Sequence, residues 1–155
     1  MLRDTRRVSS CVVVVLLALG AVHTPRTAVA QESLYDRLGG VYNIAAVVDD
    51  VVERILVNEI LEANPAVKMA HDRVPKAGLK FQVTALVCQA SGGPSTYAGR
   101  DMKTVHASLN ITQGEWDELM TIFKVTFDTF EVPEQEQAEL FAIIAATKDD
   151  IVTGP

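Results

Sequence analysis

The spacing of apolar residues predicts helices along most of residues 33–152. Between residues 44 and 55 an apolar side chain recurs every three or four positions, which places one stripe on one face of a helix after the pair Gly39-Gly40. The stripe is rich in valine, which also suits a strand, but its period favours the helix. Its members are Ile44, Val47, Val48, Val51, Val52 and Ile55.

Three further segments carry helical patterns. An apolar stripe runs from Leu79 to Ala90 and ends at Gly92-Gly93-Pro94. Thr112 and Glu115 form a capping box that begins a helix of about five turns, with a continuous apolar face from Trp116 to Phe130. Pro133 is expected in the first turn of a last helix, whose inward-facing residues are Leu140, Phe141, Ile144 and Ala145.

The remaining segments are shorter. Asp101 can cap a short helix that carries His106. Asn64-Pro65 and Val74-Pro75 interrupt helical geometry, so we expect short turns between residues 58 and 75. No strand-turn-strand pattern occurs between the helical segments. The sequence therefore predicts an all-α fold with four principal helices and several short ones.

Residues 1–30 have the order of features found in a cleavable export signal. Arginines at positions 3, 6 and 7 precede an apolar run over residues 11–22, and Ala28-Val29-Ala30 follows. A run of this length is too short for a membrane anchor, which needs roughly 20 residues. We therefore expect a signal peptide over residues 1–30, a single domain over residues 31–155, no stable membrane anchor, and a periplasmic or extracellular location.

Composition narrows the possible partners and sources of stability. Without residues 1–30, which hold four basic residues and one acidic residue, the net charge is about −9. Such a charge repels phosphate backbones, so nucleic acid is not an expected partner. Cys88 is then the one remaining cysteine, which leaves no internal disulfide. Stability must come from packing or from a bound cofactor.

The motifs of several enzyme classes are missing from the sequence. It contains no glycine-rich phosphate loop, no HExxH, no paired cysteines and no persuasive Ser/His/Asp set. The predicted domain has two histidines, His71 and His106. A helical core with a histidine beside its most apolar segments can hold haem through one imidazole.

Two strings in the sequence resemble group I truncated haemoglobins. They are SLYDRLGG at residues 33–40 and GGPSTYAGRDMKTVH at residues 92–106, and the likeness extends over about 120 residues with matching order and spacing. The resemblance implies a truncated-globin fold, a two-over-two helical sandwich with glycine pairs at its tight turns. It also implies haem as the cofactor and His106 as the protein ligand of the iron.

The resemblance also places residues around the haem. Many group I members have a tyrosine on the first long helix and a glutamine or histidine on the distal helix. The corresponding positions here are Val52 on the former and Leu79, Gln82 and Val83 on the latter, of which only Gln82 can donate a hydrogen bond. The family's pair of phenylalanines beside the haem is absent from this sequence, and Phe81 could fill their space. Met102 is a further expected haem contact, and Tyr97 either contacts haem or caps its loop.

Several alternatives stay open at the level of sequence. His71 is either a solvent-facing turn residue or a sixth iron ligand that a gas displaces. The expected function is reversible binding of a diatomic gas, dioxygen or nitric oxide, with an unidentified reductant. Its rivals are a nitric oxide dioxygenase or peroxidase-like enzyme, which the replacement of tyrosine by Val52 disfavours, and a cofactor-free helical adaptor.

Overall fold

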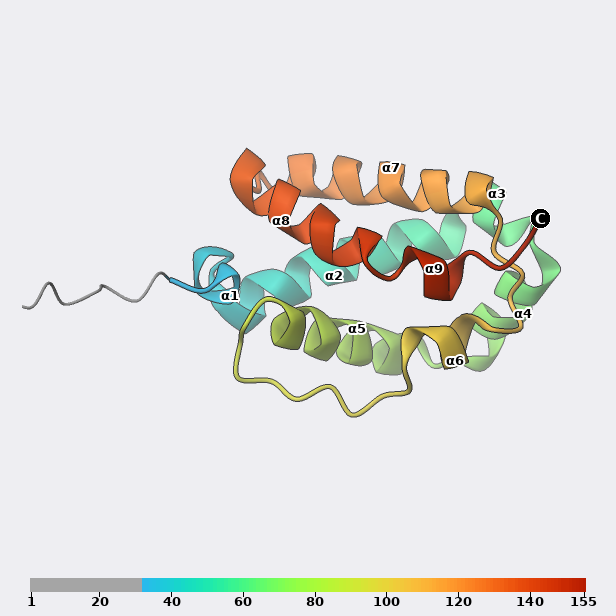
Figure 1. Ribbon diagram of the computed structural model, residues 1–155, viewed down its shortest axis with the longest axis horizontal. Coiled ribbons are helices and arrows are strands. Elements are labelled where there is room, and N and C mark those ends of the chain that lie inside the picture. Colours follow the sequence, from blue (N-terminus) through green and yellow to red (C-terminus); the bar gives the residue numbers. More distant parts are fainter. Residues whose placement is uncertain (1–31) are drawn as a thin grey trace, which may run out of the picture. The chain divides into compact units, whose positions relative to one another are not determined.

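The structure is a computed structural model that describes residues 32–155. The predicted signal peptide therefore lies outside the described residues. The described part of the chain is helical, as predicted (Figure 1). In chain order its helices are α1 (Leu34–Arg37), α2 (Gly40–Val57), α3 (Glu59–Glu62), α4 (Pro65–Arg73), α5 (Lys76–Ala90), α6 (Met102–His106), α7 (Gln113–Thr129), α8 (Glu134–Ala145) and α9 (Lys148–Ile151).

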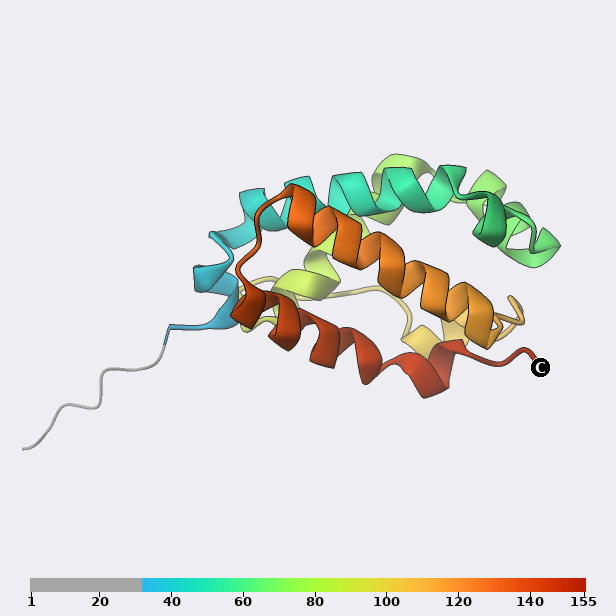
Figure 2. The same ribbon diagram turned by 90° about the horizontal axis from the view of Figure 1, so that it is seen from above.

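Four long helices, α2, α5, α7 and α8, form two layers. The predicted stripe on α2 is buried, and its residues Ile44, Val48 and Val52 pack against Cys88 of α5. In the other layer Phe127 of α7 packs against Leu140 of α8. Figures 1 and 2 show α7 and α8 side by side, with α2 and α5 on the other side of the core. Burial of the apolar faces of these helices is the main favourable contribution to folding.

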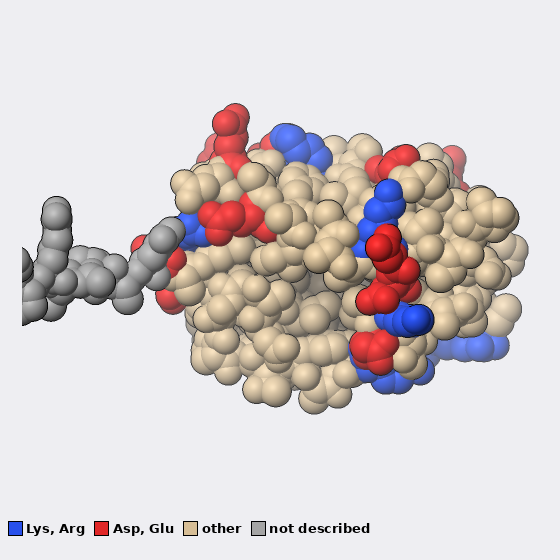
Figure 3. Space-filling model, in the orientation of Figure 1, with Lys and Arg blue, Asp and Glu red and all other residues tan. Residues whose placement is uncertain are grey.

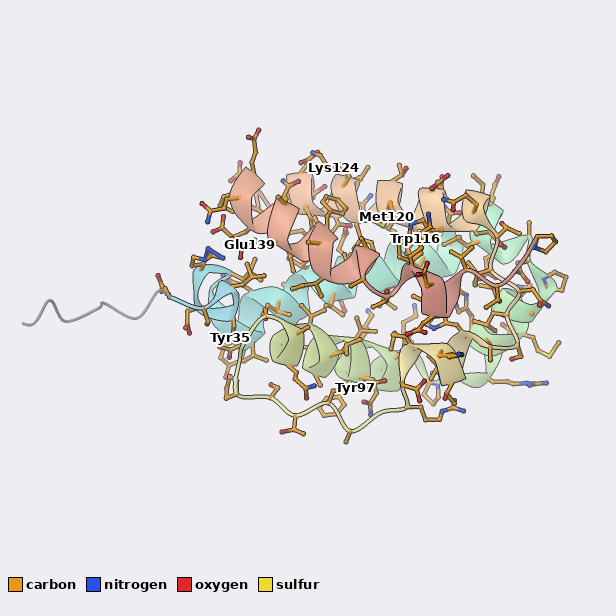
Figure 4. All side chains as sticks on the ribbon, viewed as in Figure 1. Tyr35, Tyr97, Trp116, Met120, Lys124 and Glu139 are labelled. Carbon is orange, nitrogen blue, oxygen red and sulfur yellow. The ribbon has the colours of Figure 1, made fainter. Side chains whose placement is uncertain are left out.

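Polar contacts fix the helices against one another. The guanidinium of Arg37 in α1 donates to Glu139 of α8 at 2.5 Å and lies 3.5 Å from Glu136. Figure 4 shows Glu139 on the side of α8 that faces α1. The fully buried hydroxyl of Thr126 in α7 reaches Asp50 of α2. Such contacts between helices help to set their register.

The predicted helix starts and turns are observed. The Asp101 side chain accepts from the Thr104 backbone N–H at the start of α6, and the Thr112–Glu115 capping box is complete in both directions. Gly39 and Gly92 have φ values of 84° and 87°, a region that favours glycine. Pro133 lies at the N-cap of α8, one position before the expected first turn.

The prediction for residues 58–75 was wrong, because this segment contains two helices, α3 and α4. The side chains of Asn58 and Asn64 accept hydrogen bonds from the first free backbone N–H groups of α3 and α4. Pro65 occupies the first turn of α4, where a missing N–H costs nothing. The Asn-Pro and Val-Pro pairs therefore mark helix boundaries and do not prevent helix formation. Among the described residues, no helix is both long and apolar enough to cross a membrane.

Candidate haem pocket

A cavity of about 890 Å³ lies at the centre of the helical assembly. Its walls are mainly apolar side chains from α2, α4, α5, α6, α7 and α8. This volume and this chemistry are typical of a site for a small organic molecule. Trp116, which is 4 % exposed, and Leu119 and Phe123 belong to the α7 wall. In Figure 4 the Trp116 label lies between α7 and the α6 and α9 region below it.

His106 is the last residue of α6 and lines this cavity. Its Nδ1 atom lies 2.8 Å from the carbonyl oxygen of Met102, one turn earlier in the same helix. A carbonyl oxygen can only accept, so Nδ1 carries the proton, and in the neutral imidazole the Nε2 lone pair is free. A hydrogen bond from the other ring nitrogen to a backbone carbonyl is the usual way to orient a metal-binding histidine. Met102 itself also lines the cavity.

The distal residues expected from the sequence come together from α2 and α5. Val52, Leu79 and Val83 all line the cavity, and Val52 is 2 % exposed. Gln82 also lines the cavity, but its side chain is exposed. It therefore lies at the mouth of the cavity, and the deeper distal wall is apolar.

For Tyr97 the structure supports the loop-capping role, and contact with haem stays a prediction. It lines the cavity, and its hydroxyl donates to the carbonyl oxygen of Arg100 at 2.7 Å. Its backbone N–H donates to the side-chain oxygen of Gln89 in α5. Tyr97 therefore holds the loop between α5 and α6, drawn at the bottom of Figure 4, against the pocket.

The expectation for Phe81 is not met. Its side chain is 70 % exposed and does not line the cavity. Each residue of an α-helix is rotated by about 100° from its neighbour, so Phe81 falls outside the stripe that Leu79 and Val83 place on the cavity. Spacing in the sequence could have excluded this assignment.

His71 lies neither in a turn nor on a solvent-facing surface. It belongs to the last turn of α4 and lines the cavity, with its Nδ1 atom 2.5 Å from Oε1 of Glu62. The hydrogen bond from His71, and a second from Lys68, lower the pKa of the Glu62 carboxyl, so Glu62 is ionised near neutral pH. Glu62 is not among the site residues predicted from the sequence, because the sequence predicts turns in this segment.

Charge lies mostly at the edges of the pocket. In Figure 3 the face between α8 and α5 is mainly uncharged, apart from a band of mixed charges over α9 and α6. Lys76 and Lys80 of α5 pair with Glu53 of α2. Glu115 lines the cavity; burial opposes its ionisation, but hydrogen bonds from Thr112 outweigh burial and lower its pKa.

This donor set fits haem. The cavity has extended apolar walls that suit a porphyrin and one imidazole whose Nε2 is free to bind iron. The model of the bacterial-like globin family matches residues 33–153. The chain belongs to this family. The cofactor of this globin is haem, as the sequence predicted.

Curated relatives of this globin are group 1 truncated haemoglobins. The protein from Mycolicibacterium paratuberculosis is 29 % identical over 122 residues, which are 79 % of this chain and 85 % of the relative. The protein from Nostoc commune is 34 % identical over 85 residues, or 55 % of this chain and 67 % of the relative.

Solved structures confirm the fold. Truncated haemoglobin from Tetrahymena pyriformis, in its Fe(III) form, superposes with a TM-score of 0.66 at 21 % identity, covering 79 % of this chain and 99 % of that one. A 2/2 haemoglobin from a Synechococcus species, with covalently attached haem, gives a TM-score of 0.65 at 20 % identity and covers 78 % and 98 %. The globin therefore has the two-over-two helical sandwich that the sequence predicted.

Proposed function

We propose that this globin holds haem through Nε2 of His106 and reversibly binds a diatomic gas, dioxygen or nitric oxide, at the iron. The observation that carries the proposal is the orientation of His106. The Met102 carbonyl oxygen accepts from the protonated Nδ1 atom of His106, which leaves the Nε2 lone pair free. His106 lines the cavity, so this lone pair is carried by a side chain of the cavity wall. Haem supplies the iron atom that binds the gas.

The surrounding residues favour binding over oxygen chemistry. Val52, Leu79 and Val83 exclude water and offer no hydrogen-bond donor, and the one amide among the four expected distal residues, Gln82, lies at the mouth. Activation of oxygen benefits from preorganised donors at the reacting atoms. An apolar pocket of this kind suits uptake and release of an uncharged diatomic molecule.

The test is the optical spectrum of the haem-loaded protein in ferric, ferrous and carbon monoxide-bound forms. We expect a Soret band that shifts when carbon monoxide is added, and a His106→Ala variant that binds haem weakly and loses stability. A ligand bound only by the folded state adds to the free energy of unfolding, so loss of haem affinity lowers that free energy.

Two results would decide against the proposal. A colourless protein produced with ample haem, together with a His106→Ala variant as stable as the parent, would favour a cofactor-free adaptor. Nitric oxide consumption by the reduced protein under air, much faster than by free haem, would favour the enzyme.

We also propose that the globin is exported. The support is the order of arginines, apolar run and Ala-Val-Ala site within residues 1–30. Amino-terminal sequencing of the protein recovered from its producing cells should begin at Gln31, and a mature protein that retains Met1 would refute cleavage.

A further inference from the structure

The two histidines of the described residues line the same cavity. His106 is carried by α6 and His71 by α4, and these helices are separated by α5 in the sequence. Three α4 residues, Val67, Ala70 and His71, line the cavity together with the C-cap Val74, at the spacing of one helical face. The side chain of His71 is 18 % exposed. His71 is therefore part of a wall and not of a surface turn.

Glu62 orients His71 as Met102 orients His106. The Glu62 carboxylate also pairs with Lys68, and its Oε1 lies 2.5 Å from the His71 Nδ1 atom, so Nδ1 carries the proton and donates to this oxygen. In the neutral imidazole the Nε2 lone pair is then free, and Nε2 has no hydrogen-bond partner among the described residues. A carboxylate at one ring nitrogen and a free lone pair at the other is the arrangement of metal-binding histidines.

The helix that carries His71 is firmly attached to the segment that follows His106. The side-chain amide of Asn64, the N-cap of α4, donates to the carbonyl oxygen of Leu109 at 2.9 Å. Val67, one turn before His71, is 5 % exposed. Lys68 pairs with Oε2 of Glu62, which leaves Oε1 to His71. These contacts hold α4 in place and fix the orientation of the imidazole.

Other polar groups of the cavity wall are occupied or peripheral. The Tyr97 hydroxyl donates to Arg100, and the Glu115 carboxylate accepts from Thr112. Gln82 lies at the mouth, and its uncharged amide is a poor ligand for iron compared with imidazole. His71 therefore offers the better second nitrogen for the iron.

We propose that Nε2 of His71 is a second protein ligand of the haem iron in the gas-free globin, and that an incoming gas displaces it. This proposal rests on the proposed function, since it needs haem bound through His106. It assigns Glu62 as a positioning residue that keeps the His71 Nε2 lone pair available. Gas affinity is then set partly by the fraction of molecules in which His71 is detached.

The experiment compares four haem-loaded full-length proteins: the parent, His71→Ala, Glu62→Gln and Met69→Ala, the last a control at an exposed α4 position outside the cavity wall. Optical and electron paramagnetic resonance spectra report the spin state of the iron. We expect the ferric parent and Met69→Ala to be low-spin with two nitrogen ligands, and His71→Ala to be high-spin. Glu62→Gln should show a partial shift to high spin, because the amide is a weaker acceptor for His71 Nδ1–H. A purely structural role of His71 would not change the spin state.

Carbon monoxide binding gives a second, quantitative measurement. If His71 is attached in about 90 % of molecules, its removal should raise the observed affinity about tenfold. Free imidazole added to His71→Ala should restore the low-spin spectrum, which also shows that the variant is folded.

Two outcomes would overturn the proposal. The first is a high-spin or water-ligated parent with the same spectrum as His71→Ala. The second is a five-coordinate ferrous parent in which His71 only slows the loss of dioxygen, which would make His71 a hydrogen-bond donor to the gas. In either case the Soret band remains dependent on His106, whereas failure of haem binding through His106 would remove the Soret band itself.

Discussion

The hydroxyl of Thr126 in α7 donates to a carboxylate oxygen of Asp50 in α2, at 2.8 Å. Thr126 has no exposed surface, and the same carboxylate oxygen accepts from Arg54 at 2.5 Å. The two layers of the sandwich are thus joined by a hydrogen bond to a charged group. Hydrogen bonds of this type contribute more to stability than those between neutral groups.

Thr126→Val should therefore destabilise the globin by about 1–2 kcal/mol, because the isosteric valine cannot donate to Asp50. Thr121→Val is the matched control. Thr121 is exposed on the same helix, and its hydroxyl donates only to the backbone carbonyl of Asp117. Thr121→Val should therefore change the free energy of unfolding by no more than about 0.5 kcal/mol. Urea denaturation followed by circular dichroism measures both, and equal values would contradict the assignment.

Stability should fall in acid partly through Asp50. The hydrogen bond from Arg54, and a weaker one from Thr126, hold the pKa of Asp50 below its usual value. The unfolded chain therefore binds a proton at higher pH than the folded chain. The stabilisation from Asp50 is complete above about pH 4 and is lost as the pH falls through the lower, folded pKa.

Asp50→Asn should accordingly flatten the acid limb of the stability curve. The free energy of unfolding, measured in urea at several pH values below about 5, should fall less steeply with decreasing pH in this variant than in the parent. Asp149→Asn, at an exposed position without an ion pair in the described structure, should keep the parental slope. An Asp50→Asn curve parallel to that of the parent would refute the prediction.

Two glycines should respond to alanine in opposite directions. A Cβ atom at Gly93 would lie 2.4 Å from Cδ2 of Tyr35 and 2.8 Å from the carbonyl oxygen of Cys88. Figure 4 shows Tyr35 beside α1, at the end of the sandwich where this loop begins. The backbone oxygen cannot move freely, so Gly93→Ala should destabilise the fold by about 1–3 kcal/mol.

Gly78→Ala is the counterpart. Gly78 lies in the first turn of α5, and a Cβ atom there meets nothing within 4 Å. Alanine reduces the entropy of the unfolded chain and favours helix, so the variant should gain about 0.5–1 kcal/mol. Thermal denaturation should move the midpoints of the two variants in opposite directions; a shift in the same direction would show that the turn or the helix is not built as described.

A donor placed in the apolar distal wall should strengthen the binding of dioxygen. Leu79 lines the cavity, and Leu79→Gln introduces an amide of similar size. One added hydrogen bond of about 1 kcal/mol corresponds to a roughly fivefold slower dissociation of dioxygen. Stopped-flow measurements with Phe81→Gln as the control decide the matter, since Phe81 is exposed on the same helix outside the cavity. Equal dissociation rates of dioxygen in the two variants would contradict the placement of Leu79 in the pocket.

Local sequence patterns are sufficient to predict the all-α class, the helix starts at Asp101 and Thr112, and the buried stripe on α2. These features depend on neighbours within one or two turns, so local patterns carry them. The same patterns, together with the family strings, pointed to His106. They do not predict α3 and α4, because a proline that interrupts one helix can also begin the next, as Pro65 does.

Which side chains share the cavity depends on contacts between helices that are distant in the sequence. His71 and His106 meet one cavity because α4 is attached through Asn64 to the chain beyond α6, a contact between residues 45 positions apart. The outward rotation of Phe81, the place of Gln82 at the mouth and the pairing of Glu62 with His71 also follow from packing between helices. A periodic sequence marks a face on each helix, but the partner of that face depends on how the helices are assembled.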